Sequence, residues 1–210
     1  IPNRFGSFLT PSVVSVMEDG SVAVGQIAKE RLITHPKDTA ASFKKKMGTT
    51  QNYVLGGRNF LPEELSGFVI SAIVEDARNY LQEDVEDVII SVPAYFHDKQ
   101  RVATKRAGAL AGVMVKRIIN EPSAAALASY FDTRQEQLFL VFDFGGGTLD
   151  VSIVDCFDTM VEILAVSGDN HLGGDDFNEA IAGGFLKEHQ LQQKYLSETE
   201  YAILLRQAEK

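Results

Sequence analysis

The sequence has a single cysteine and no long apolar run, and these two features exclude a disulfide-stabilised protein and a protein with a membrane-spanning helix. Cys156 is the only cysteine among 210 residues, so no intrachain disulfide can form and a reducing compartment, the cytoplasm, is expected. Its apolar neighbours predict a small buried hydrophobic residue rather than a nucleophile. No run of about 18 apolar residues could span a membrane. No secretory signal is recognisable, and since Ile1 is not a natural start, an upstream segment is expected.

An excess of basic residues is also missing. The chain has 20 Lys and Arg against 29 Asp and Glu, which gives a formal net charge of −9. Nucleic acids and anionic membranes would require a basic face, so neither is an expected partner. The 45% hydrophobic and 23% charged residues are typical of a globular protein, with a length that suits one large domain or parts of two.

Two common phosphate-binding motifs are absent as well. No G-x-x-x-x-G-K-[ST] string occurs, and the G-x-G-x-x-G pattern fails because the sixth position counted from Gly145 is Asp150. His171 and His189 lack partners at metal-ligand spacing, so no zinc site is expected.

What the sequence does contain is a glycine-rich turn, residues 145–148, between two apolar stretches, 138–142 and 151–154, which read as strands of a hairpin. A hairpin turn does not need three consecutive glycines, but backbone without Cβ atoms can approach a ligand and direct N–H groups at it. Asp143 and Asp150 flank the turn. Carboxylates bind phosphate through a hydrated Mg²⁺ ion. The pattern predicts a Mg²⁺-phosphate cradle; the alternative is a plain hairpin with two solvated aspartates.

The rest of the chain reads as an α/β protein, because strands alternate with helices in its middle part. The expected strands are 12–16, 22–25, 85–92 (buried), 113–119 and 160–166, and the expected helices are 39–47, 62–81, 98–111, 123–130, one from about Phe177, and 198–210. The 62–81 helix carries an apolar stripe assigned to the core: Leu65, Phe68, Val69, Ala72, Ile73, Ala77 and Tyr80. Gly112 is expected to cap the 98–111 helix.

Several polar residues have two interpretations at this stage. Lys44, Lys45 and Lys46 suit a solvated basic face, and nothing in the pattern selects one of them. Glu121 suits a helix start, and Pro93 a strand end. Amides at the start of the helix near Phe177 favour an anion, but Asp175 and Asp176 can cap them instead, and capping is favoured for Asp176.

Four strings together resemble the DnaK-type, 70-kilodalton heat-shock chaperones. They are residues 91–96 (SVPAYF), 119–126 (INEPSAAA), 143–150 (DFGGGTLD) and 168–177 (GDNHLGGDDF). They occur in the family's order and spacing, and the resemblance covers essentially the whole chain. The stretch between Lys44 and Leu65 resembles the HscC branch.

The resemblance implies an actin-like ATPase (ribonuclease H-like) fold with two lobes that close on Mg-ATP. The first lobe would be residues 1–135, with an upper subdomain at about 12–62, and residues 136–210 would be part of the second lobe. The implied function is an ATP-binding and ATP-hydrolysing module that couples nucleotide state to binding and release of unfolded polypeptides. Expected partners are these clients through a substrate-binding domain, a J-domain co-chaperone and a nucleotide exchange factor.

The resemblance also assigns roles to individual residues. Water would attack the γ-phosphate in line, with positioning and charge stabilisation as the protein's main contributions. The catalytic residues would be Lys44, Glu121, Asp143, Thr148 and Asp150. Asp143 and Asp150 would hold Mg²⁺ through water, with Glu121 in its outer shell. ATP or ADP would contact Gly145, Gly146, Gly147, Thr148, Gly174, Asp175 and Glu209. Pro93, Arg101 and Lys105 would couple nucleotide state to the substrate domain.

The family's first phosphate loop, its later Gly-Gly-Ser loop and most of its adenosine-gripping helix, which would begin near Glu209, have no counterpart in these residues. We therefore expect a fragment incomplete at both ends, weak or inactive alone, with an open sheet edge at 160–166 and exposed apolar surface. A small-molecule kinase of the same superfamily and a non-catalytic actin-like assembly protein are the alternative functions, since fold alone does not separate them.

Overall fold

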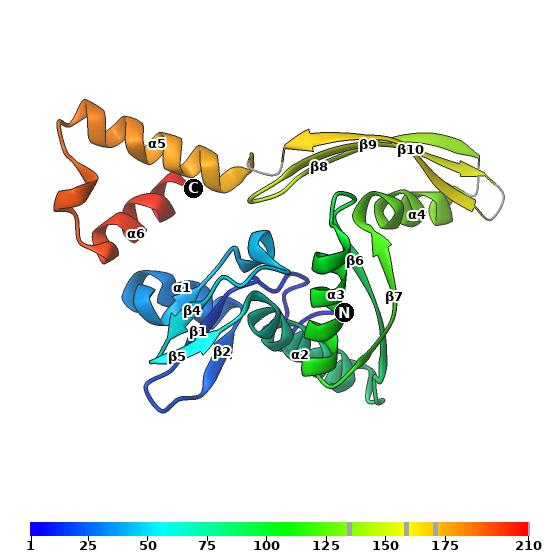
Figure 1. Cartoon of the computed structure of the whole chain (residues 1–210), viewed down its shortest axis with the longest axis horizontal. Helices are drawn as coiled ribbons and strands as arrows, with labels where there is room; N and C mark the ends of the chain where they lie inside the picture. The colour runs from blue at the N-terminus through cyan, green and yellow to red at the C-terminus, as the bar shows by residue number, and fades with distance from the viewer. Residues whose placement is uncertain (134–135, 158–159, 170–171, 210) are drawn as a thin grey trace.

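The computed structural model describes residues 1–133, 136–157, 160–169 and 172–209, and it is an α/β protein in two halves. The N-terminal half contains β1 to β7 with α1 to α3, and the C-terminal half contains α4 to α6 with β8 to β10 (Figure 1). None of the helices in the described part of the chain has the length and apolar character needed to cross a membrane.

A small antiparallel sheet begins the N-terminal half. Its strands lie in the order β2 (Val22–Val24), β1 (Val14–Val16), β3 (Thr39–Ala40), and α1 (Gln26–Thr34) follows β2. The predicted strands 12–16 and 22–25 are confirmed, and Gly20 takes the positive φ of 82° that their turn needs. A second hairpin pairs β4 (Tyr53–Leu55) with β5 (Arg58–Phe60). Val14, Phe43 and Leu65 lie in the core that joins these elements.

The helix predicted over residues 39–47 is wrong. Thr39 and Ala40 belong to β3, and only the short 3₁₀ helix η2 (Phe43–Lys46) follows, after η1 (Pro36–Asp38). The Thr39 hydroxyl donates to Ser15 Oγ at 2.9 Å, which ties residue 39 to the sheet. Ser42 then adopts a left-handed conformation, with φ of 54°, that no α-helix can pass through.

The longest helix, α2 (Pro62–Leu81), matches its predicted bounds. The stripe assigned to its core is only partly buried, because Ile73 and Tyr80 are 48% and 59% exposed. The helix instead contacts neighbours on two sides: Val69 packs against the first sheet and Gly67 lies against Leu110 of α3. The buried surface of α2 therefore consists of two faces, one toward the first sheet and one toward α3, and not of the single predicted stripe.

A parallel crossover closes the N-terminal half. β6 (Asp87–Val92) and β7 (Met114–Asn120) pair in parallel and are joined by α3 (Asp98–Leu110), as the strand-helix-strand pattern predicts. Gly112 follows the helix with a φ of 77°, which fits its predicted role at the C-terminal end. β6 is not fully buried as expected, since Ile89 is 63% exposed.

The C-terminal half is built on an antiparallel meander. β8 (Gln137–Phe144) pairs with β9 (Leu149–Phe157), which pairs with β10 (Met160–Asp169). α4 (Glu121–Thr133) packs on one face, where Val154 and Cys156 are fully buried, so the predicted burial of Cys156 is confirmed. The opposite face of β8 is exposed: Leu138, Leu140 and Phe142 are 64%, 71% and 65% accessible. In the described chain β10 and β8 are both edge strands.

Two helices complete the chain. α5 (Gly174–Glu188) and α6 (Glu198–Ala208) pack together, with the 3₁₀ helix η3 (Gln193–Tyr195) between them. α6 also contacts α1, so the pair reaches from the meander back to the N-terminal half (Figure 1). α6 ends at Ala208 with Glu209 as its C-terminal cap, and the prediction that this helix continues to residue 210 falls on a residue outside the described chain.

Candidate functional site

The glycine-rich turn joins β8 and β9 as predicted. Asp143 lies directly opposite Asp150 in the register, and the Gly145 N–H donates to the Thr148 carbonyl at 3.0 Å. Directly opposite residues on antiparallel strands direct their side chains to the same face. The two aspartates therefore stand side by side at the base of the turn.

The start of α5 docks onto this turn. The Gly174 and Asp175 N–H groups donate to the Gly145 and Gly146 carbonyls at 3.0 and 2.7 Å. A Cβ at Gly173 would overlap the backbone of Gly146 and Gly147, so only glycine fits there. These helix-start amides consequently stabilise the turn, and the nucleotide contact expected at Gly174 stays a prediction.

Asp176 caps α5, as favoured from the sequence. Its Oδ2 accepts the Gly173 N–H at 2.8 Å. The helix begins at Gly174, three residues before the expected start near Phe177, because this capping bond and the contacts to the turn order the first residues.

Asp150 is the buried member of the carboxylate pair. It is 4% exposed and its Oδ1 has no hydrogen-bond partner in the protein. Burial, with the neighbouring Asp143 charge as a second cause, raises the pKa of the Asp150 carboxyl, while a Thr148 hydrogen bond and Lys44 act in the opposite direction. Asp143 itself is exposed. The pair thus offers one solvent-facing carboxylate and one partly desolvated carboxylate to a cation.

Lys44 reaches this site from the N-terminal half. Its Nζ donates to Glu121 Oε1 at 2.7 Å. Glu121 is the first residue of α4, directly after β7, so the helix starts two residues before its predicted first residue, Ser123. The resemblance selected Lys44 and Glu121 separately, and the structure brings them together as an ion pair.

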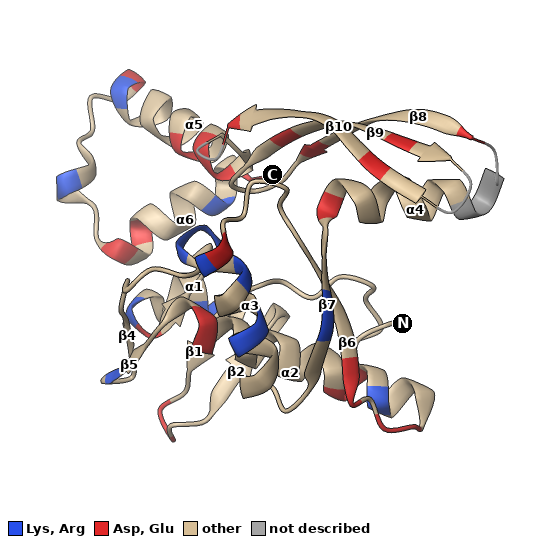
Figure 2. Ribbon diagram, turned by 45° about the vertical axis from the view of Figure 1, so that its right-hand side comes forward, with Lys and Arg blue, Asp and Glu red and all other residues tan. Residues whose placement is uncertain are grey.

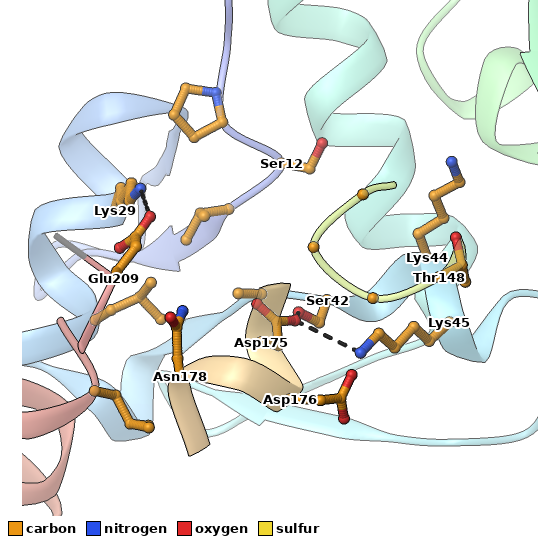
Figure 3. Close-up of a pocket in the computed structure, with 18 of the residues that line it drawn as sticks. Ser12, Lys29, Ser42, Lys44, Lys45, Thr148, Asp175, Asp176, Asn178 and Glu209 are labelled. Carbon is orange, nitrogen blue, oxygen red and sulfur yellow. Dashed lines mark hydrogen bonds and ion pairs between the residues drawn. The ribbon is translucent and has the colours of Figure 1, made fainter. Parts of the chain in front are cut away.

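A cavity of about 850 Å³ lies between the two halves and includes these groups. Its lining contains Lys44, Glu121, Asp143, the turn 145–148 and Asp175 (Figure 3). Glu209, the C-terminal cap of α6, also lines it, and its Oε1 accepts from Lys29 Nζ at 2.6 Å; its contact with the nucleotide stays a prediction.

The cavity also contains residues that sequence reasoning did not select. Lys45 Nζ lies 3.6 Å from Asp175 Oδ2, and Ser42 Oγ donates to the same oxygen at 3.0 Å. Lys29 and Arg206 line the far end. These residues come from segments that are distant in the sequence, so spacing could not reveal them.

The three residues predicted to couple the domains lie in the segment formed by the end of β6 and α3. Pro93 lines the cavity just after β6. Arg101 donates through Nε to the Phe96 carbonyl at 3.0 Å and through Nη2 to Asn120 Oδ1 at 2.7 Å. It therefore connects the loop after β6 to the residue that precedes Glu121. Lys105 is exposed on α3, and the coupling role of all three stays a prediction.

No group of three or more His, Cys, Asp or Glu side chains suited to a metal ion occurs among the residues that the structure describes. The zinc prediction involving His171 falls outside the described residues. Mg²⁺ commonly uses one or two carboxylates with waters and phosphate oxygens. The Asp143 and Asp150 pair, with an unpartnered buried oxygen, fits that type of site.

The fold and site define an α/β protein in which a glycine-rich hairpin turn, a lysine and the exposed member of a carboxylate pair line one large cavity. The family model for "Hsp70 protein" matches residues 1–55 and 49–210, and the chain belongs to this family. It is 45% identical over 193 residues to "Chaperone protein DnaK" of Thermotoga neapolitana. The alignment covers 91% of this chain and 32% of that relative, so the chain spans about a third of the relative's length.

Proposed function

We propose that the chain is the ATP-binding and ATP-hydrolysing part of a molecular chaperone. The observation that carries this proposal is the shared cavity: the turn 145–148, Asp143 and the Lys44–Glu121 ion pair line it, in a chain of the Hsp70 family. Asp150 lies directly opposite Asp143 in the strand register. A small-molecule kinase and an assembly protein are not favoured, because the family match includes the whole chain.

The phosphates would lie against the turn. Gly146 and Gly147 would donate backbone N–H groups to the β- and γ-phosphates, and the Thr148 hydroxyl would lie beside the γ-phosphate. The Gly145 N–H, also expected to be a phosphate donor, is instead bonded to the Thr148 carbonyl. Lys44 would offset the charge that develops on the transferred phosphoryl group. Gly174 and Glu209 would complete the nucleotide contacts, Glu209 near the sugar and base, and Asp175 would lie beside the phosphates.

The two carboxylates would hold Mg²⁺ through water molecules, and the ion would neutralise phosphate charge. Asp150 would orient the attacking water, since its Oδ1 is free to accept a hydrogen bond. Glu121, held in place by Lys44, would act on the same water or on the outer shell of the metal. The chemistry would consist mainly of positioning and charge stabilisation.

At the scale of the whole protein, we propose that the chain belongs to an actin-like ATPase with two lobes, divided near residue 135, so that α4 would belong to the first lobe by sequence although it packs on the meander of the second. Pro93, Arg101 and Lys105 would transmit nucleotide state to a substrate-binding domain that binds unfolded polypeptides. A J-domain co-chaperone and a nucleotide exchange factor would regulate the cycle in the cytoplasm. The relative named as a chaperone supports this assignment.

The test is a calorimetric titration of Mg-ADP into the chain and into the Asp143→Ala variant. We expect binding by the parent chain and a loss of at least about tenfold in affinity in the variant, because one of two carboxylates for the ion is removed. Asp155→Ala, on β9 but away from the turn, is the matched control and should bind like the parent. Equal binding by Asp143→Ala and the parent would contradict the proposed site.

A further inference from the structure

Lys45 lies across the glycine turn, although nothing in the sequence pattern distinguishes it from Lys44 and Lys46. The tight turn of η2 directs Lys44 and Lys45 to different partners, since successive residues of a 3₁₀ helix are about 120° apart. Lys44 reaches Glu121, whereas Lys45 reaches Asp175 at the start of α5. Figure 3 shows Lys45 extending toward Asp175 and Ser42. Its side chain is only 30% exposed.

The Lys45 side chain is in direct contact with Gly147. A Cβ atom added there would overlap Lys45 Cε and would lie 2.6 Å from Nζ. The ammonium group is therefore beside the backbone segment proposed to bind phosphate. Asp175 lies next to Gly146 in the same way, since a Cβ there would be 3.6 Å from Oδ1. The glycine turn is thus in contact with one cation, Lys45, and lies next to one carboxylate, Asp175.

This arrangement raises an electrostatic problem for any phosphate ligand. Six acidic and four basic residues are among the described residues that line the cavity. A polyphosphate beside Gly146 would approach the Asp175 carboxylate, and like charges at such distances repel strongly when partly shielded from water. Lys45 is the side chain that neutralises Asp175 at this position. A lysine has a flexible stem and a compact charge, so it can move between two anions that lie close together.

We propose that Lys45 is a second phosphate-binding cation of the site, and that its ammonium group exchanges the Asp175 carboxylate for a β- or γ-phosphate oxygen when nucleotide binds. This inference rests on the proposed nucleotide site and adds a residue to it. Lys44 and Lys45 then hold the polyphosphate from the two sides of the glycine turn. Asp175, bonded to Ser42, competes with phosphate for Lys45 and so limits the affinity.

The test compares three variants of the chain by calorimetric titration with Mg-ADP and with inorganic tripolyphosphate. Lys45→Met should bind both ligands at least about tenfold more weakly, because a charge-assisted contact is lost. Lys45→Arg keeps the charge and should stay within about threefold of the parent chain. Lys46→Met removes the same charge from the next, exposed residue of η2 and should stay within about twofold.

A fourth variant tests the competition. Asp175→Asn should strengthen binding in the parent background, and it should restore part of the affinity lost in Lys45→Met. Circular dichroism checks that each variant is folded. If folded Lys45→Met binds like Lys46→Met, the role of Lys45 is overturned while the proposed function stands. If the parent chain binds neither ligand, both fail.

Discussion

At the scale of single residues, Asp150 combines burial with a like charge directly opposite it. Burial, the first cause, and Asp143 raise its pKa in the folded chain. Between the unfolded pKa, about 3.9 for aspartate, and the raised folded value, the folded chain binds more protons than the unfolded chain. The stabilising contribution of the protonated group is therefore fully present below the unfolded pKa and is lost as pH rises through the folded pKa.

Replacement of Asp150 by Asn should consequently stabilise the chain at pH 7. The gain in melting temperature over the parent, expected to be a few degrees, should shrink as pH falls toward 4, since the carboxyl is then neutral in the parent as well. Thermal unfolding followed by circular dichroism between pH 4 and 8 measures this. Asp155→Asn, on the same strand, should show no such pH-dependent gain. A constant difference between Asp150→Asn and the parent across the range would contradict the prediction.

Residue roles were predictable from the sequence where they depend on near neighbours. Asp176 caps α5 through Gly173, three positions away, and the Asp143 and Asp150 pair follows from the length of the turn. Lys45 could not be found in this way. Its partner Asp175 is 130 positions further along the chain, and three adjacent lysines look alike until η2 orients them.

At the scale of the helices, α5 carries glycines in two contrasting environments. Gly173, just before it, has no room for a Cβ because the backbone of Gly146 and Gly147 occupies the space. Gly183, inside the helix, has nothing within 4 Å of the same atom. The two sites therefore form a matched pair for the same substitution.

Gly173→Ala should destabilise the chain by roughly 1–3 kcal/mol, because the start of α5 must move off the turn. Gly183→Ala should instead stabilise it by roughly 0.5–1 kcal/mol, because alanine favours a helix interior. Urea denaturation at constant pH measures both values. Gly173→Ala should also weaken Mg-ADP binding, whereas Gly183→Ala should not. Equal effects of the two substitutions would mean that α5 does not depend on the turn.

The sequence predicted most elements because their signals are local. Apolar periodicity marks α2, and the crossover β6, α3, β7 follows from alternation of strand and helix patterns. The helix predicted over residues 39–47 is wrong because of contacts that are distant in the sequence. Thr39 bonds to Ser15 in another strand, and Ser42 takes a left-handed conformation that its residue type does not predict. The exposure of one face of β8 could not be predicted either, because an apolar stretch does not indicate which of its two faces is covered.

At the scale of the whole molecule, ion pairs connect the two halves around the cavity. Lys29 of α1 pairs with Glu209 at 2.6 Å, and Lys37 approaches Glu198 at 3.8 Å. Figure 2 shows acidic residues along α5 and α6, the helices that reach toward the N-terminal half. Lys29 and Glu209 both line the cavity, so their ion pair lies at its wall, where it could affect release of the proposed nucleotide.

Loss of the Lys29–Glu209 pair should speed release of bound Mg-ADP. Both side chains are 40–48% exposed, so the pair contributes at most about 1 kcal/mol and Lys29→Ala should raise the release rate by no more than about fivefold. Stopped-flow displacement of a fluorescent ADP analogue measures the rate.

The control is Lys37→Ala, which removes a longer, more exposed ion pair and should change the release rate less. At about 1 M salt, where charges are screened within about 3 Å, the parent should approach Lys29→Ala. A parent rate that does not respond to salt, with Lys29→Ala unchanged, would show that the packing of α1 against α6 alone holds this wall of the cavity.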